Sequence, residues 1–198
     1  MVSLELPKEI YSLEVAQELL PIWTDWGTAD TGCSIHSLGT SFFTLLGRKL
    51  GYVSVSEFPV PREGEYSTTG DDVRCDSVWF DLHSRSPSVI VEFERYTSIA
   101  DENKLEGKVR NLLLAHHRMR DVPRWLILAY WTEGLASLPN HARFDQIIRQ
   151  GFDTPERRRI AGTHEGHLLC LQFINEADKQ KSLRLTKILQ RGSYESSF

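Results

Sequence analysis

The spacing of apolar residues in the first half of the chain predicts one helix followed by three strands. Apolar residues that recur every three or four positions indicate a helix from Ser34 to about Leu50, and Gly51 follows as a C-terminal stop. Apolar and polar residues then alternate in three segments, which predicts strands. These segments span residues 52–60, 73–81 and 88–94. The Ser/Arg/Pro turn at 84–87 predicts that the last two strands form a β-hairpin.

The second half continues with alternating helices and strands. Residues 125–131 are almost continuously apolar, which predicts a buried central strand, and a helical apolar face precedes them over 101–119. The other predicted elements are a first helix (13–23), a helix (141–150), a strand (167–173) and a final amphipathic helix (177–190). This order predicts an α/β fold, with a mixed central sheet flanked by helices in a single domain, 1–198. Its parts are an N-terminal helical segment (1–33), the core (about 34–131) and a C-terminal elaboration (132–198).

The composition, 40% hydrophobic and 25% charged over 198 residues, fits a folded soluble domain and excludes a disordered or collagen-like chain. The longest apolar run, 125–131, is shorter than the ~18 residues of a membrane span, so we expect no membrane segment. We see no secretory signal either. Cys33, Cys75 and Cys170 form no Cys-x-x-Cys pair, which argues against disulfides or a structural zinc site. A cytoplasmic location is therefore expected.

The net charge of −4 is divided unevenly along the chain. Residues 1–94 hold 6 basic and 15 acidic residues, whereas residues 95–159 hold 12 basic and 8 acidic residues. This asymmetry fits an acidic patch opposite a basic surface, or two separately solvated faces. The acidic total counts against nonspecific coating of nucleic acid, but a local basic surface could still grip it.

Three carboxylates are expected on one face of the predicted hairpin. Successive side chains of a strand point to opposite faces, so Asp76 shares one face of its strand with Val78 and Phe80. Glu92 and Glu94 share one face of the next strand with Ile90. A turn centred near Ser84 or Arg85 places Asp76 opposite Glu92 or Glu94. Like charges this close raise carboxyl pKa values unless a cation relieves them, and oxygen ligands favour Mg²⁺, Mn²⁺ or Ca²⁺ over zinc.

A strand with glutamates at alternate positions is also common as a plain solvated face. Two features favour a functional site instead. The alternate residues of 89–93 are apolar, so the strand is anchored in the core. The following helix carries Lys104, Lys108 and Asn111 on one stripe, from which they can face the same end of the sheet.

These residues resemble the motif of a known family. Asp76, fifteen residues and then Glu92-Phe93-Glu94, within the predicted order of elements over about 34–131, resemble the PD-(D/E)xK nuclease superfamily. The resemblance implies a restriction-endonuclease-like αβββαβ core. It also implies an endonuclease that hydrolyses phosphodiester bonds with Mg²⁺ or Mn²⁺. DNA is a more expected substrate than RNA, and the sequence leaves the choice of polymer open.

Two positions depart from the family motif. Cys75 stands where the motif has proline, and Glu94 stands where it has lysine. Some members of the fold use Glu-x-Glu, and in others the lysine moves to the following helix, where Lys104 and Lys108 lie.

The resemblance also implies roles for the site residues. Asp76, Glu92 and the backbone carbonyl of Phe93 would hold the metal. Glu94 would bind a second metal or orient the attacking water, and Lys104 or Lys108 would offset charge in the transition state. Because one site cuts one strand, cleavage of a duplex would favour a homodimer.

Other charged or polar residues are candidates for contacts with nucleic acid. Arg95, Asn111 and the run Arg157-Arg158-Arg159 could contact the backbone, although a run of arginines is as often a solvated surface. His116 and His117 end a predicted helix, where an imidazolium interacts favourably with the helix dipole, and we favour this role over a metal site.

One alternative function remains open from the sequence. With Glu94 in the lysine position, the same fold could be an inactive domain that binds nucleic acid or protein. A nuclease should need a divalent metal, whereas a binding domain should bind equally well in EDTA.

Overall fold

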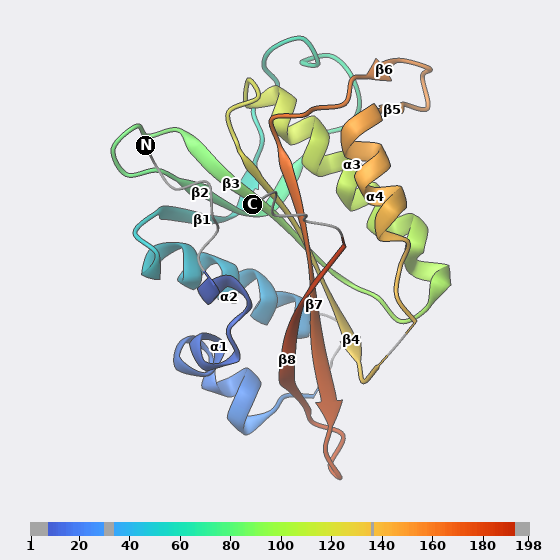
Figure 1. Ribbon diagram of the computed structural model, residues 1–198. Coiled ribbons are helices and arrows are strands. Elements are labelled where there is room, and N and C mark those ends of the chain that lie inside the picture. Colours follow the sequence, from blue (N-terminus) through green and yellow to red (C-terminus); the bar gives the residue numbers. More distant parts are fainter. Residues whose placement is uncertain (1–7, 30–33, 136, 193–198) are drawn as a thin grey trace, which may run out of the picture.

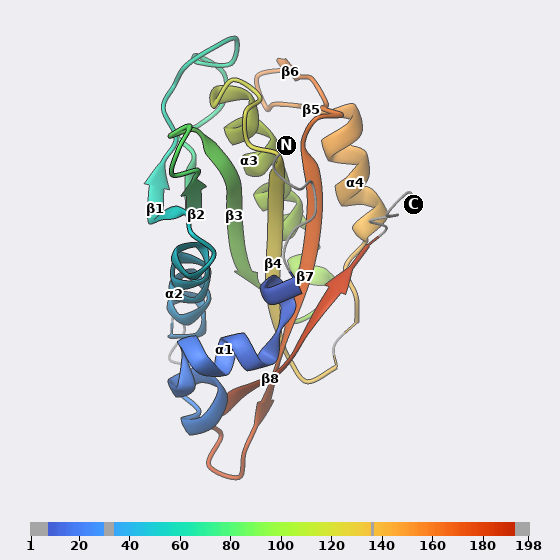
Figure 2. The same ribbon diagram turned by 60° about the vertical axis from the view of Figure 1, so that its left-hand side comes forward.

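The computed structural model describes residues 8–29, 34–135 and 137–192. Its centre is a six-stranded mixed sheet (Figures 1 and 2). The strands, which lie side by side in chain order, are β1 (Val53–Pro59), β2 (Arg74–Phe80), β3 (Pro87–Arg95), β4 (Trp125–Glu133), β7 (His167–Ala177) and β8 (Leu183–Arg191). Two short strands, β5 (Phe152–Asp153) and β6 (Arg159–Ile160), form a separate ribbon.

The sheet combines antiparallel and parallel pairs. Strands β1, β2 and β3 are antiparallel neighbours, β3, β4 and β7 run parallel, and β8 returns antiparallel to β7. Helix α3 (Glu102–Arg118) is the crossover that the parallel pair β3–β4 requires, and α2 (Ser34–Lys49) precedes β1. The segment from α2 to β4 therefore has the αβββαβ order, and the prediction of a single α/β domain is confirmed.

Helices cover both faces of the sheet (Figure 2). Helices α3 and α4 (His141–Gln150) pack on one face, around a core that includes Val78, Ile90 and Leu128. On the other face lie α1 (Leu13–Leu19), α2 and the short turns η1 (Lys8–Tyr11) and η2 (Ile22–Trp26). A further short turn, η3 (Ile99–Asp101), leads into α3.

Strand β3 contributes to both cores because its side chains alternate. Val89, Val91 and Phe93 are buried on the α2 side, as the sequence predicts, whereas Ile90 is buried on the α3 side. The ring of Phe93 lies among other aromatic rings, with its centroid 5.5 Å from that of Phe173. Residues 89–93 are all buried, so β3 is a rigid support for the acidic residues on it.

The prediction of a helix at 177–190 is wrong, because this segment forms the turn and the second strand of the β7–β8 hairpin. Asp178 organises the turn: its Oδ1 accepts the backbone N–H groups of Gln180 and Ser182. Leu183 and Leu185 then point inward at alternate positions, which is a strand pattern. The spacing of the charged residues around these leucines resembles that of an amphipathic helix.

The N-terminal part also differs from the prediction. Helix α1 ends at Leu19, before Pro21, and η2 is a separate π-helical turn rather than a continuation of α1. Cys75 and Cys170 are buried free thiols, whereas Cys33 lies outside the described residues. Within the described ranges, no helix combines the length and the apolar character needed to cross a membrane.

Replacement of Gly39 by alanine should destabilise the fold. A Cβ at Gly39 would overlap the buried Phe93 ring, because α2 lies directly on β3 at this point. Overpacking of this kind lowers the free energy of unfolding by about 1–3 kcal/mol, which urea unfolding would measure.

Gly107 in α3 provides the matched control. A Cβ there would meet nothing within 4 Å, so Gly107→Ala should leave the free energy of unfolding unchanged or raise it by about 0.5–1 kcal/mol. Equal effects at Gly39 and Gly107 would contradict the close contact between α2 and β3.

Candidate active site

The hairpin register brings Asp76 and Glu92 together at one end of the sheet. Ser77 pairs with Val91 and Val78 with Ile90, so the same register places Asp76 opposite Glu92. Asp76 Oδ2 accepts the backbone N–H of Phe93 at 2.6 Å, which fixes this carboxylate against β3. The carboxyl end of β3, where Glu92 lies, is the sheet edge at which ligands commonly bind in folds of this kind.

Helix α3 supplies the cation that lies between these two carboxylates. Lys108 Nζ is 2.6 Å from Glu92 Oε2 and 3.7 Å from Asp76 Oδ2. Both carboxylates are strongly buried: the Asp76 side chain is 7% exposed and the Glu92 side chain is 0% exposed. The Lys108 side chain is 21% exposed. Of the two lysines that the helix pattern singles out, Lys108 is the one that reaches Asp76 and Glu92.

Burial dominates the ionisation of this cluster. Desolvation raises the pKa of Glu92 to about 8, with a further increase from Asp76, and Lys108 only partly opposes it. Burial by itself would lower the pKa of Lys108, but Glu92 and Asp76 outweigh this effect and raise its pKa above the usual value. Lys108 is therefore an ammonium ion at neutral pH.

Glu94 is held by a second lysine. Its Oε1 lies 2.9 Å from Lys104 Nζ and accepts the backbone N–H of Arg95 at 2.8 Å. The side chain of Lys104 is 54% exposed, so solvent weakens this ion pair far more than it weakens the pair between Lys108 and Glu92.

Two residues that the sequence did not single out join the site from other elements. His36, in the first turn of α2, has its Nε2 3.6 Å from Asp76 Oδ1. Glu57 lies between the β1 residues that pair with Ser77 and Cys75 on β2, and so opposite Asp76. Ligand atoms of His36, Glu57 and Asp76 lie within 4.8 Å of one another. The alternation of residues along β1 could have indicated that Glu57 faces Asp76. No pattern in the sequence indicates that His36 lies near Asp76.

A hollow of about 510 Å³ adjoins His36 and Glu57 along α2. Hydroxyl groups dominate its polar lining, which consists of Ser37, Thr40, Ser41, Thr44 and Ser56 in addition to His36 and Glu57. Thr40 Oγ1 is buried without a hydrogen-bond partner. The hollow therefore offers uncharged hydrogen-bonding groups beside the carboxylates.

The carboxylates of Asp76 and Glu92, with His36 and Glu57 near Asp76, form a cluster that fits a divalent cation. We call it the carboxylate cluster. Glu92 Oε1 is buried and has no hydrogen-bond partner, although a buried carboxylate oxygen ordinarily has one. Lys108 is shared by Asp76 and Glu92, so two negative charges meet one positive charge once Glu92 ionises. Carboxylate oxygens with one nearby imidazole form a donor set that could hold a divalent ion.

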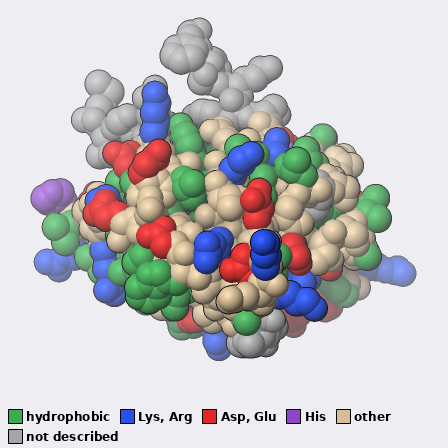
Figure 3. Space-filling model, turned by 90° about the horizontal axis from the view of Figure 1, so that it is seen from below, with side chains coloured by type: hydrophobic (Ala, Val, Ile, Leu, Met, Phe, Trp, Pro, Cys, Tyr) green, Lys and Arg blue, Asp and Glu red, His purple; other side chains and the backbone are tan. Residues whose placement is uncertain are grey.

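The uneven charge of the sequence is partly resolved by these contacts. The acidic residues of the first half meet basic residues of the second half across the α3–β3 contact, where Lys108 pairs with Glu92 and Lys104 pairs with Glu94. On the face seen in Figure 3, acidic and basic side chains are interspersed.

The residues expected to contact nucleic acid lie at different places around the sheet. Arg95 directly follows Glu94, which accepts its backbone N–H. The guanidinium of Arg95 stacks over the ring of Trp131, 4.8 Å from its centroid. Asn111 lines a different hollow, beside Phe152. The run 157–159 lies around the β5–β6 ribbon, near the C-terminal end of α3 (Figure 1).

Arginine side chains of this run bind protein groups. Arg158 Nη1 hydrogen-bonds Thr68 Oγ1 at 3.3 Å, and Arg159 pairs with Asp153. A contact between this run and the phosphate backbone stays a prediction.

Comparisons with protein-family models, with curated proteins and with solved structures found no match. The function must therefore be inferred from the chemistry of the site.

The metal-free protein should lose stability as the pH rises from about 5 to 8. The pKa of Glu92 is raised from its ordinary value of 4.5 to about 8 in the folded state. The protonated carboxyl therefore favours folding at low pH, and this contribution is lost as Glu92 ionises.

The measurement is urea unfolding in EDTA, compared with Glu92→Gln, which keeps the shape and removes the titration. Over this pH range the free energy of unfolding of the wild type should fall by about 2–4 kcal/mol relative to the variant. Parallel pH profiles for the two proteins would exclude the raised pKa.

Proposed function

We propose that this protein is a divalent-metal-dependent nuclease of the PD-(D/E)xK type, which hydrolyses phosphodiester bonds in nucleic acid, with DNA as the preferred substrate. The observation that carries the proposal is the position of Lys108 Nζ between the carboxylates of Asp76 and Glu92. The αβββαβ order from α2 to β4 supports it, since this arrangement places the motif aspartate and glutamate on adjacent antiparallel strands.

Asp76 and Glu92 would hold the metal, Mg²⁺ or Mn²⁺, with His36 and Glu57 near enough to take part. When bound, the ion would polarise a phosphoryl oxygen and lower the pKa of a water molecule. Glu92 must release its proton to act as a ligand, and the adjacent ammonium of Lys108 favours that release.

The remaining charged groups would act on the nucleic acid and the water. Lys108 would stabilise the negative charge that develops on the phosphorus oxygens, which is the role of the motif lysine. Glu94 Oε1 is engaged by Lys104 and the backbone of Arg95. Its other oxygen, Oε2, would accept a proton from the attacking water.

The hydroxyl-lined hollow along α2 would receive the nucleic-acid backbone. Serine and threonine hydroxyls commonly donate hydrogen bonds to phosphate oxygens and position the polymer without reading its bases. Thr40, whose Oγ1 has no partner, is the most buried polar group of this lining.

Isosteric changes at the metal ligands should abolish cleavage. Asp76→Asn and Glu92→Gln should each reduce cleavage of plasmid and linear DNA in Mg²⁺ or Mn²⁺ by about 100-fold or more, because loss of metal-assisted stabilisation costs several kcal/mol. Glutamine is preferable to alanine at position 92, since Glu92 is fully buried and truncation would leave a cavity.

Glu63→Gln is the matched control, because it removes an exposed carboxylate that pairs with Arg120. This variant should cleave at the wild-type rate, and EDTA should stop both proteins. Wild-type rates in both Asp76→Asn and Glu92→Gln would refute the nuclease. If the wild type cleaves nothing but binds DNA or RNA equally well in EDTA, the protein is the non-enzymatic binding domain.

The two lysines should differ in importance. Lys108→Ala removes the ammonium ion beside Glu92 and should lower the cleavage rate by about 100-fold or more. Lys104 is largely exposed and contacts only Glu94 in the cluster, so Lys104→Ala should lower the rate by about tenfold or less. Initial cleavage rates at saturating Mn²⁺ would test this order. A larger loss in Lys104→Ala would assign the lysine role to Lys104.

A further inference from the structure

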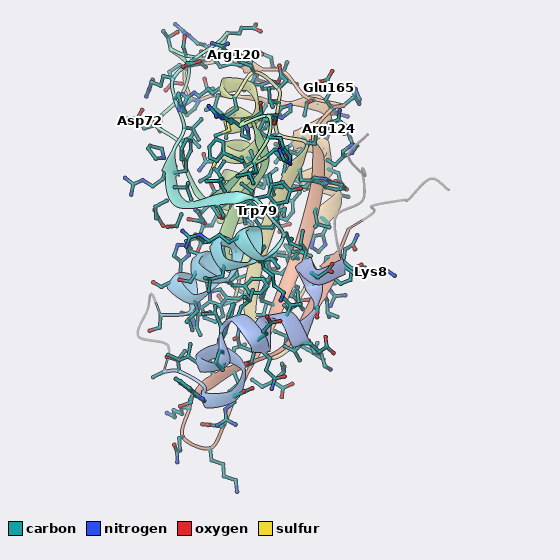
Figure 4. All side chains as sticks on the ribbon, turned by 90° about the vertical axis from the view of Figure 1, so that its left-hand side faces the viewer. Lys8, Asp72, Trp79, Arg120, Arg124 and Glu165 are labelled. Atoms are coloured by element: carbon teal, nitrogen blue, oxygen red, sulfur yellow. The ribbon has the colours of Figure 1, made fainter. Side chains whose placement is uncertain are left out.

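A second group of metal-ligating side chains lies at the C-terminal end of α3. His116 and His117 occupy the last turn of the helix, and Asp121 lies in the turn that follows. From Lys108 to His116 the helix rises about 12 Å, so this group is separate from the carboxylate cluster. Figure 4 shows the labelled residues Arg120, Arg124 and Glu165 at this same end of the molecule.

Each imidazole is oriented by a backbone carbonyl group. His116 Nδ1 lies 2.9 Å from the carbonyl oxygen of Pro123, and His117 Nε2 lies 2.8 Å from that of Ala161. A carbonyl oxygen only accepts hydrogen bonds, so each of these nitrogens carries a proton. In the neutral rings, His116 Nε2 and His117 Nδ1 therefore present lone pairs. Metal-binding histidines are oriented in this way, with the distal N–H donated to a carbonyl or carboxylate.

The two lone pairs meet the same carboxylate oxygen. Asp121 Oδ1 is 3.3 Å from His116 Nε2 and 2.5 Å from His117 Nδ1. The other polar neighbour of His116 Nε2 is the Thr163 hydroxyl, at 3.2 Å. A single cation would satisfy all three groups.

We propose that His116, His117 and Asp121 form a binding site for a transition-metal ion of the Zn²⁺ class. Two imidazoles and a carboxylate suit Zn²⁺, whereas the oxygen-rich cluster at the other end of α3 suits a harder ion. Bond lengths near 2.1 Å in a tetrahedral site separate the ligand atoms by about 3.4 Å. The distance from His116 Nε2 to Asp121 Oδ1 already matches, and the half-exposed Asp121 needs to move from His117 by less than about 1 Å.

The surroundings allow an ion to enter and a further ligand to bind. Asp121 lines an open hollow of about 540 Å³ together with Val122, Arg124, Glu165 and His167. Water or the carboxylate of Glu165 would take the remaining position. The ion would link the last turn of α3 to the turn that carries Asp121, beside the segment from Ala161 to Thr163 that contacts both histidine rings.

The experiment uses the full chain, freed of metal with EDTA and then desalted. Calorimetric titration with Zn²⁺ is made on Asp76→Asn/Glu92→Gln, in which the carboxylate cluster is disabled. This protein should bind one Zn²⁺, and Co²⁺ should give visible absorption bands from imidazole and carboxylate ligation. Zn²⁺ should also raise its melting temperature, because only the folded state has the site.

Addition of Asp121→Asn, or separately His117→Gln, should weaken Zn²⁺ binding by at least tenfold and remove the Co²⁺ bands. Asp121 is half exposed, so the first variant should fold, and the second is independent of it. His83→Gln removes an exposed histidine and is the control that should change nothing. The proposal is overturned if Asp76→Asn/Glu92→Gln binds no Zn²⁺, or if both further variants bind it as before. Neither result depends on cleavage of nucleic acid.

Discussion

The buried contact between Lys108 and Glu92 is the interaction on which the architecture of the site depends. Glu92 is fully enclosed within β3, where burial raises the pKa of its carboxyl group to about 8, so the ionisation of Glu92 depends on a nearby cation. Lys108, whose Nζ is 2.6 Å from Glu92 Oε2, supplies that cation only if α3 crosses the sheet at one particular height. Because Asp76 shares the same ammonium group, the register of the β2–β3 hairpin is tied to the position of α3.

The opposite face of β3 provides the rigidity that this arrangement needs. Phe93 lies immediately next to Glu92 in the chain, yet its ring is buried on the α2 side, against Gly39 and among the rings of Trp23 and Phe173. Trp23 also donates to Asn175 Oδ1 at 2.6 Å, which ties the N-terminal segment to β7. Neighbouring residues of one strand thus serve different purposes, since successive side chains point to opposite faces.

Helix α3 carries ionisable groups of different chemical character at its two ends. Near its start, Lys104 and Lys108 face carboxylates, which are hard oxygen donors. At its end, ring nitrogens of His116 and His117 lie close to a carboxylate oxygen of Asp121. Ligand type governs which ions bind, so in the two proposed sites the ends of one helix would favour different metals.

The sequence by itself determined most of the element order and which residues face the core, because helical and strand periodicity depend on residues only two to four positions apart. The hairpin turn limited the partner of Asp76 to Glu92 or Glu94, and the register of the structure selects Glu92. It misassigned 177–190, where the side chain of Asp178 builds a turn that periodicity does not show.

Only the tertiary structure decided which groups complete each site. The choice of Lys108 over Lys104 depends on where α3 crosses the sheet, and the approach of His36 to Asp76 depends on how α2 packs on β3. The orientation of His117 depends on the carbonyl group of Ala161, 44 residues away in the chain. Contacts between distant segments are set by the burial of whole faces, and no local pattern of residues records them.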